Sequence, residues 1–372
     1  MKQVQLTKRQ DLFIELLRLA VDEHRRSLSY SPSPADWAWL FSESRRQAVV
    51  GVMYAAVERL LAAQRPPREV LLPWYAMVER VKLRNEQLNA EATRVCLTLS
   101  REGLDCVLLK GQGVALYYPQ PLLRQPGDID LWILASRQRI MEHTQKGREH
   151  KVHTTWLHTV FDESSLTEVE AHFMPSYRYN PFRHGAMNSV FKQMAAAQLS
   201  HQVALTANES ARVSAPTTAF NRVYLLAHIY RHFFGEGIGV RQLMDYYYCL
   251  RQGMTEAEAR TMRRQLKRMG MTRFASATMY VMQQLFGLPV QYMPLMPDKR
   301  EGILLLNEVL LAGNFGQHDV RYAELSSQRR FSRFVAKSRR NINFLVHYPG
   351  EVLFDVPFRL CHYVWRWGRG YL

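Results

Sequence analysis

Two aspartates with alternating spacing, Asp128 and Asp130, stand in the otherwise apolar stretch Gly127-Asp128-Ile129-Asp130-Leu131-Trp132-Ile133. Residues two apart on a β-strand leave the same face, so the two carboxylates are expected to lie side by side. Adjacent carboxylates repel each other, and a bound Mg²⁺ ion removes that cost and turns the pair into a phosphate-binding device. The spacing therefore indicates metal-dependent chemistry on a nucleoside triphosphate.

A third carboxylate is expected on a neighbouring strand, because transfer of a nucleotidyl group uses two metal ions, or one metal and a strong positive clamp. Our choice is Glu170, within Glu168-Val169-Glu170-Ala171-His172. Glu168 has the same strand parity and is the competing choice. His172 would share that face as a base or as a group that supports the metal ligands, although a structural role for this histidine is the commoner one.

Two cations precede or flank the aspartates. Lys110 ends the apolar stretch Val107-Leu108-Leu109, and Arg124 lies four residues before Asp128. Lys110 would act as a point charge on phosphate, and Arg124 would clamp phosphate or orient Asp128. Each also has a structural interpretation, as a lysine at the end of a strand and as the partner of a surface acid.

The elements that must position these residues form a short α/β block over residues 105–175. Apolar runs and breaks predict strands over 106–109 and 128–134, a strand or hairpin arm over 151–161 and a strand over 167–174. Short helices are expected over 111–118 and 136–146. Longer helical patterns precede the block at 5–28, 34–42, 43–62 and 68–102, and follow it at 186–198, 217–234, 239–252, 255–269, 271–286, 299–313 and 328–346. The expected fold is α+β, a small mixed-sheet core embedded in a mostly helical chain.

These motifs together resemble the uncharacterised nucleotidyltransferase family of the polymerase-β-like superfamily. The matching pieces are Leu108-Leu109-Lys110-Gly111, Arg124 with Gly127-Asp128-Ile129-Asp130-Leu131, Val169-Glu170-Ala171-His172-Phe173 and Gly239-Val240-Arg241-Gln242-Leu243-Met244-Asp245. The resemblance covers most of residues 75–320. It implies that Asp128 and Asp130 bind metal, that Glu170 is the third acid, and that Gly111 lets the backbone approach the triphosphate.

The chain departs from the superfamily pattern at the glycine turn. A Gly followed by Gly or Ser is usual there, whereas Gly111 is followed by Gln112, with Gly113 one residue later. Help from a hydroxyl in that turn is therefore not expected, and Lys110 would supply charge instead. We count Gly111 and Gly113 with the nucleotide-binding residues.

Two later motifs are candidates for a part in the site. Arg241 and Asp245 follow the glycine-rich Gly235-Glu236-Gly237-Ile238-Gly239, and the helix they begin could face the nucleotide across a cleft. Arg241 would contact phosphate, and Asp245 would hold Arg241 or the base; a structural pair is the alternative. His228 and His232 have a spacing that can bind metal, but without an HExxH arrangement structural or capping roles are favoured.

Composition limits the setting of this chemistry. The net charge of the 372 residues is +16, and residues 326–372 carry nine Arg and Lys against two acids. This excess suits a polyanionic partner such as RNA as well as a solvated basic surface. No apolar stretch reaches the length of a membrane span, and no secretory signal is evident. Four scattered cysteines predict neither a zinc site nor a disulfide framework, which fits a reducing cytoplasm.

The sequence therefore predicts four regions and one activity. The regions are a helical region over 1–102, a nucleotidyltransferase core over 103–180, a helical domain closing the nucleotide cleft over 181–325 and a basic, aromatic helical tail over 326–372. The activity is transfer of a nucleoside monophosphate from an NTP, with Mg²⁺ or Mn²⁺, to a hydroxyl or phosphate on RNA, a protein or a small molecule, with release of pyrophosphate. The alternative is a non-catalytic nucleotide or nucleic-acid binding module on the same scaffold.

Overall fold

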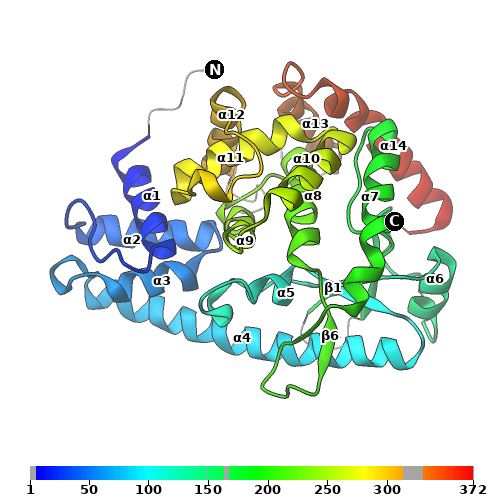
Figure 1. Cartoon of the computed structure of the whole chain (residues 1–372), viewed down its shortest axis with the longest axis horizontal. Coiled ribbons are helices and arrows are strands. Elements are labelled where there is room, and N and C mark those ends of the chain that lie inside the picture. Colours follow the sequence, from blue (N-terminus) through cyan, green and yellow to red (C-terminus); the bar gives the residue numbers. More distant parts are fainter. Residues whose placement is uncertain (1–5, 149, 163–166, 313–329, 372) are drawn as a thin grey trace.

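A mostly helical chain surrounds one small sheet in the computed structural model (Figure 1), which describes residues 6–148, 150–162, 167–312 and 330–371. The fold is α+β, as predicted. No helix in these ranges is long and apolar enough to cross a bilayer. The division into four regions stays a prediction.

Four strands form the sheet in the order β1-β2-β4-β3. They are β1 (Cys106–Leu109), β2 (Ile129–Ile133), β3 (His158–Asp162) and β4 (Val169–His172). β1 is antiparallel to β2, β2 is parallel to β4, and β4 is antiparallel to β3. In this register Asp130 is paired with both Leu109 and Glu170, so the ends of three strands bring the predicted residues together.

Alternation along the strands gives the sheet two different faces. Ile129, Leu131 and Ile133 belong to an apolar cluster with the long helix α4 (Arg68–Arg101). The residues between them, Asp130 and Trp132, leave the opposite face, where Trp132 stacks on Phe220 at a ring-centroid distance of 5.8 Å. The polar groups of the sheet therefore face the second half of the chain.

The helices before the sheet are α1 (Lys8–Val21), α2 (Pro34–Arg46), α3 (Val50–Arg59) and α4, with a 3-10 turn η1 (Ala62–Gln64). Thr7 and Ser33 begin α1 and α2 with capping boxes. α4 extends along the bottom of the molecule in Figure 1, beneath α5 (Gly111–Ala115) and β1, and contacts β1 and β2. After β1 come α5 and the 3-10 turn η2 (Pro121–Leu123), and α6 (Arg137–Gln145) follows β2.

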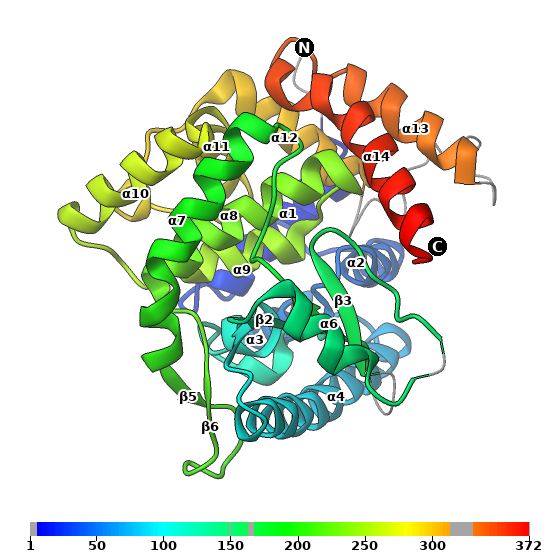
Figure 2. The ribbon, with the colours of Figure 1, turned by 90° about the vertical axis from the view of Figure 1, so that its right-hand side faces the viewer.

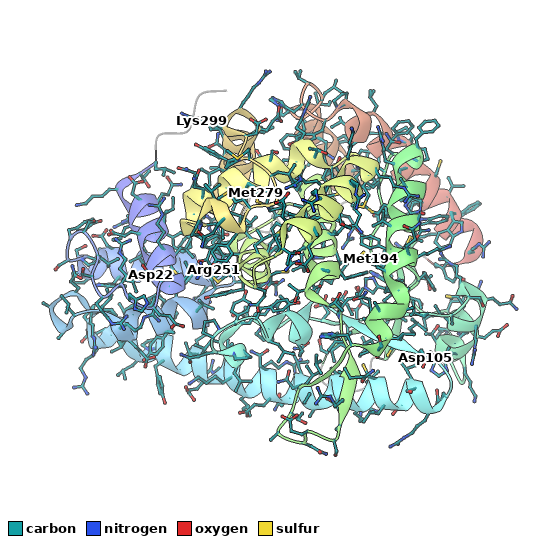
Figure 3. The ribbon with its side chains drawn as sticks, in the orientation of Figure 1. Asp22, Asp105, Met194, Arg251, Met279 and Lys299 are labelled. Atoms are coloured by element: carbon teal, nitrogen blue, oxygen red, sulfur yellow. The ribbon has the colours of Figure 1, made fainter. Side chains whose placement is uncertain are left out.

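The helices after the sheet lie above it in Figure 1. They are α7 (Pro181–Ser200), α8 (Thr218–Gly235), α9 (Val240–Arg251), α10 (Glu256–Met269), α11 (Thr272–Phe286) and α12 (Lys299–Ala312), with a 3-10 turn η3 (Val290–Tyr292). Figure 3 shows side chains packed throughout this half, among them the fully buried Met279 of α11. α8 packs on α9, which brings both helices to the polar face of the sheet.

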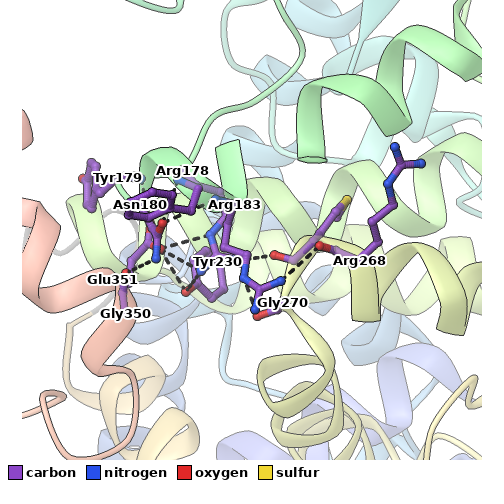
Figure 4. A network of polar contacts seen from close by, with 11 residues as sticks. Arg178, Tyr179, Asn180, Arg183, Tyr230, Arg268, Gly270, Gly350 and Glu351 are labelled. Atoms are coloured by element: carbon purple, nitrogen blue, oxygen red, sulfur yellow. Dashed lines mark hydrogen bonds and ion pairs between the residues drawn. The ribbon is translucent and has the colours of Figure 1, made fainter. Parts of the chain in front are cut away.

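Two C-terminal helices, α13 (Arg330–Ile342) and α14 (Pro349–Arg369), cover one side of this half (Figure 2). α14 is held by a buried charge pair in which Arg178 donates to Glu351 Oε2 from Nε at 3.0 Å and from Nη2 at 2.7 Å (Figure 4). The backbone amide of Tyr179 donates to the other Glu351 oxygen at 2.8 Å. Removing one partner of such a pair leaves an uncompensated buried charge, so this network fixes where α14 begins.

Three local differences from the sequence prediction have simple causes. The expected helix over 43–62 is split, because Ala48 takes a positive φ of 55° between α2 and α3. A short hairpin of β5 (Gln202–Ala204) and β6 (Arg212–Ser214) was not predicted, since three-residue strands give too few alternations to detect. The strands at 128–134 and 167–174 are shorter than expected, and Asp128 stands one residue before β2 rather than inside it.

Candidate functional site

A cavity of about 250 Å³ lies between the polar end of the sheet and helices α8 and α9. It gathers residues from four separate segments of the chain. Its lining consists of Lys110, Gly111, Arg124, Pro126, Gly127, Asp128, Asp130, Leu225, His228, Ile229, Arg241, Gln242 and Asp245. Seven of the ten site residues predicted from the sequence are in that list.

The turn between β1 and α5 presents Lys110 to this cavity in a strained backbone conformation. Lys110 has a φ of 50° and a ψ of −143°, and Gly111 follows with a φ of 41°. A positive φ is costly for a residue with a side chain and persists where the surroundings impose it, commonly at functional sites. The turn brings Lys110 Nζ to 2.8 Å from Asp130 Oδ1.

The two aspartates share the cavity but differ in their electrostatic surroundings. Burial raises the pKa of Asp128 above its usual value, and the negative charges of Asp130 and Glu170 add to this rise. Burial also opposes the charge on Asp130, but Lys110 and His172 outweigh it and lower the pKa of that carboxyl. Asp128 is therefore the carboxylate whose charge is less well compensated by the protein.

Glu170 and His172 lie beside Asp130 rather than in the cavity lining. His172 Nε2 is 2.8 Å from Asp130 Oδ1 and 3.0 Å from Glu170 Oε2. His158, on the next strand, places its Nδ1 2.9 Å from the same Glu170 oxygen. Burial alone would raise the pKa of Glu170, but the two histidines lower it well below its usual range. Glu168 lies just outside β4, and its backbone oxygen accepts from Ile129 at 3.2 Å.

Arg124 and Asp245 form a buried ion pair with each other. Arg124 donates to the two carboxylate oxygens from Nε and Nη2, at 2.8 Å each, and Tyr118 donates its hydroxyl to Oδ1 at 2.6 Å. Burial opposes the charge on Arg124, but Asp245 more than offsets it and raises the pKa of the guanidinium. Asn85 of α4 donates to the backbone oxygens of Leu122 and Arg124, at 2.7 Å each, which anchors the loop before β2.

Arg241 crosses from α9 to that same loop. Its Nη1 donates to the Pro126 carbonyl oxygen at 3.4 Å, and a side-chain carbon at Gly127 would stand 3.4 Å from this nitrogen. Burial and the positive charge of Arg124 lower the pKa of Arg241, whereas Asp245 and Asp128 raise it. Arg241 therefore brings positive charge to the side of the cavity occupied by Asp128.

His228 and His232, the spaced pair on α8, have different surroundings. Arg231 Nη2 lies 2.7 Å from His232 Nε2, and His232 Nδ1 lies 2.7 Å from Glu236 Oε2, so both ring nitrogens of His232 are engaged. His228 lines the cavity, and burial followed by the charge of Lys110 lowers its pKa well below the usual value. A neutral imidazole therefore faces the aspartates from α8.

The structure thus brings together Lys110, Gly111, Arg124, Asp128, Asp130, Arg241 and Asp245, and places the other three predicted residues around them. Gly113 lies under the turn, where an added side-chain carbon would be 3.4 Å from the Leu108 carbonyl oxygen. Sequence reasoning did not identify Tyr118, His158 or Gln242. The available signal for His158 was its spacing from Val160. Residues two apart on a strand share a face, and Val160 is paired with Glu170 in the sheet.

Several cations of the basic C-terminal region are used inside the protein. Arg340 Nε lies 3.4 Å from Glu308, and Arg359 makes two contacts to Asp355, at 3.0 and 2.8 Å. Lys337 Nζ is 3.9 Å from that same aspartate. Arg329 lies outside the described residues. These internal pairs account for part of the basic excess, for which a polyanionic partner and a solvated basic surface were the two interpretations.

Comparison with known proteins gives one match. The family model described as uncharacterised nucleotidyltransferase matches residues 33–287, more than half of the chain. No curated protein and no solved structure matches. The match spans the whole cavity lining, from Lys110 to Asp245. The chain therefore belongs to this nucleotidyltransferase family.

Proposed function

We propose that this protein transfers a nucleoside monophosphate from an NTP to an acceptor hydroxyl or phosphate, with a divalent metal ion and release of pyrophosphate. The observation that carries the proposal is the common cavity of Asp128, Asp130, Lys110 and Arg241. It places two carboxylates and two cations from separate segments around one space. Such a set suits a metal-bound triphosphate, which needs both carboxylate ligands and positive charge.

The donor set fits Mg²⁺ or Mn²⁺. Both aspartates offer hard carboxylate oxygens, and the less compensated Asp128 lines the cavity beside Asp130. A divalent ion held by these two carboxylates would neutralise the triphosphate and favour ionisation of the attacking acceptor oxygen. We infer, as the family resemblance implies, that Asp128 and Asp130 are metal ligands and that Glu170 is the third acid.

The other residues position the substrates and balance charge. Lys110 would contact phosphate from the strained turn, and Gly111 would let the backbone approach it. Arg241 would contact phosphate from α9. The Arg124–Asp245 pair would hold the loop before β2 at a fixed distance from α9, and Arg124 would not contact phosphate directly. His172 would hold Asp130 and Glu170 in register.

The acceptor is best sought by transfer of label. Full-length protein is incubated with each α-³²P-labelled NTP and Mg²⁺ or Mn²⁺, in a cell extract that contains RNA, protein and small molecules. Label on RNA, on a protein or on a small molecule that requires active protein supports the proposal and names the acceptor class. NTP binding with no transferred label under any of these conditions would contradict it and favour a binding module.

A further inference from the structure

Three side chains next to Asp130 form a second group of possible metal ligands. His158 of β3 and Glu170 and His172 of β4 each offer one ligand atom, and these atoms all lie within 4.8 Å of one another. His158 and His172 are directly paired in the sheet register, and Val160 is paired with Glu170. The group thus comes from two adjacent strands and does not depend on a loop.

The two separations from Glu170 Oε2 are compatible with those between ligands of one metal ion. Glu170 Oε2 is 2.9 Å from His158 Nδ1 and 3.0 Å from His172 Nε2. Two ligand atoms at about 2.1 Å from a metal and at right angles to each other lie roughly 3.0 Å apart. His158 and Glu170 each keep 15% of their side-chain surface exposed, which gives an ion a route to the group.

Two imidazole nitrogens converge on one carboxylate oxygen of the group, Glu170 Oε2. His158 Nδ1 is buried 2.9 Å from this oxygen and has no other polar partner within the part of the chain that the structure describes. His172 Nε2 lies between an oxygen of Asp130 and an oxygen of Glu170, although a single N–H can point at only one of them. The three ligand atoms therefore lie close enough together for one cation to replace the contacts between them.

We propose that His158, Glu170 and His172 bind a first-row transition-metal ion such as Mn²⁺, Co²⁺ or Zn²⁺, next to the carboxylate pair Asp128 and Asp130. Imidazole nitrogen favours late first-row ions such as Zn²⁺, and the Glu170 carboxylate is a ligand that Mn²⁺ favours, so a mixed set of this kind suits these ions better than Mg²⁺, which prefers oxygen ligands. This inference deepens the proposed function, on which its catalytic relevance rests, because Asp130 Oδ1 lies 2.8 Å from His172 Nε2 and the two groups are therefore adjacent. Glu170, the expected third acid, would then bind metal together with two histidine nitrogens, and the site would prefer a transition-metal ion over Mg²⁺.

Mn²⁺ binding by the metal-stripped, full-length protein tests this inference without any turnover. Electron spin echo of bound Mn²⁺ is expected to show ¹⁴N modulation from directly coordinated imidazole, and a tenfold excess of Mg²⁺ is expected not to remove it. The modulation should persist in Asp128→Asn, which alters only the carboxylate pair. Calorimetric titration should show binding at least about tenfold weaker in His158→Gln, because that variant loses one ligand.

His24→Gln is the control, since His24 is an exposed histidine outside the sheet. It is expected to bind Mn²⁺ as the unaltered protein does. Bound Mn²⁺ without nitrogen coupling in the unaltered protein would overturn the inference, and so would the absence of saturable binding of Mn²⁺, Co²⁺ or Zn²⁺. Both outcomes are measured on the unaltered protein, so a variant that fails to fold does not change the conclusion. Label transfer from NTP is measured separately, so failure of the proposed function is recognised as a different result.

Discussion

Arg124 and Asp245 are joined by two parallel hydrogen bonds of 2.8 Å across the floor of the cavity, although 121 residues separate them in the chain. One comes from the loop that precedes β2 and the other from α9, so the pair fixes the distance between the aspartate-bearing strand and the helices opposite. Both residues are buried, at 5% exposure each. The sequence had offered both residues as nucleotide contacts, and the structure shows that each meets the other.

Asp245→Asn is expected to destabilise the protein by about 3–5 kcal/mol, because it leaves the buried charge of Arg124 without its partner. Tyr118→Phe removes only the hydroxyl that donates to Asp245, and should cost less, about 1.5–3 kcal/mol. Chemical denaturation of the two variants and the parent protein measures both changes. Equal stability of Asp245→Asn and the parent would contradict a structural role for the pair.

Lys110→Met is expected to weaken NTP binding and lower label transfer, since the variant removes the positive charge that lies 2.8 Å from Asp130. A single lost charge-stabilising group typically costs about 10²-fold to 10³-fold in rate. Lys82→Met is the matched control, because Lys82 is an α4 lysine that pairs with Glu79 and does not belong to the cavity lining. A Lys110→Met protein with unchanged NTP affinity and rate would remove Lys110 from the site.

Acid is expected to destabilise the fold through His232. Burial, followed by the charge of Arg231, lowers the pKa of His232 to about 4, whereas an unfolded histidine titrates near 6.5. Between these values the unfolded chain binds the extra proton, so stability falls as the pH drops from about 6.5 to about 4. The loss should be on the order of 1–3 kcal/mol and should be smaller in His232→Gln.

Denaturation of the parent, His232→Gln and the exposed-histidine control His24→Gln, at pH 4.5 and pH 7, isolates this contribution. The control should follow the parent. If the parent and His232→Gln lost the same stability between the two pH values, His232 would not be a buried neutral histidine.

The core of the site was predictable because strand alternation is a strict constraint. Asp128 and Asp130 within an apolar stretch indicated a shared face, and the structure places both at one cavity. Glu170 and His172 are two residues apart, which predicted that they share one face of their strand, and both lie near Asp130. The role of Glu170 as the third acid stays a prediction.

Contacts between distant segments could not be predicted in the same way. Whether Arg124 meets phosphate or Asp245 depends on how α9 packs on the loop before β2, and no local pattern encodes that packing. His158 was missed because the predicted strand over 151–161 had no fixed register, whereas pairing with β4 sets which of its side chains face Glu170. Composition also could not show which cations are paired inside the protein, as Arg340 is with Glu308.

Transfer of label from an α-³²P-labelled NTP by the Asp128→Asn variant shows whether this cavity carries out nucleotidyl transfer. Asp105→Asn is the matched control, because Asp105 is an exposed aspartate immediately before β1. We expect the parent and Asp105→Asn to label the same acceptor, and Asp128→Asn to lose about 10²-fold to 10³-fold of the rate while remaining folded. Full transfer activity in a folded Asp128→Asn protein would contradict the assignment of this cavity as the site of nucleotidyl transfer.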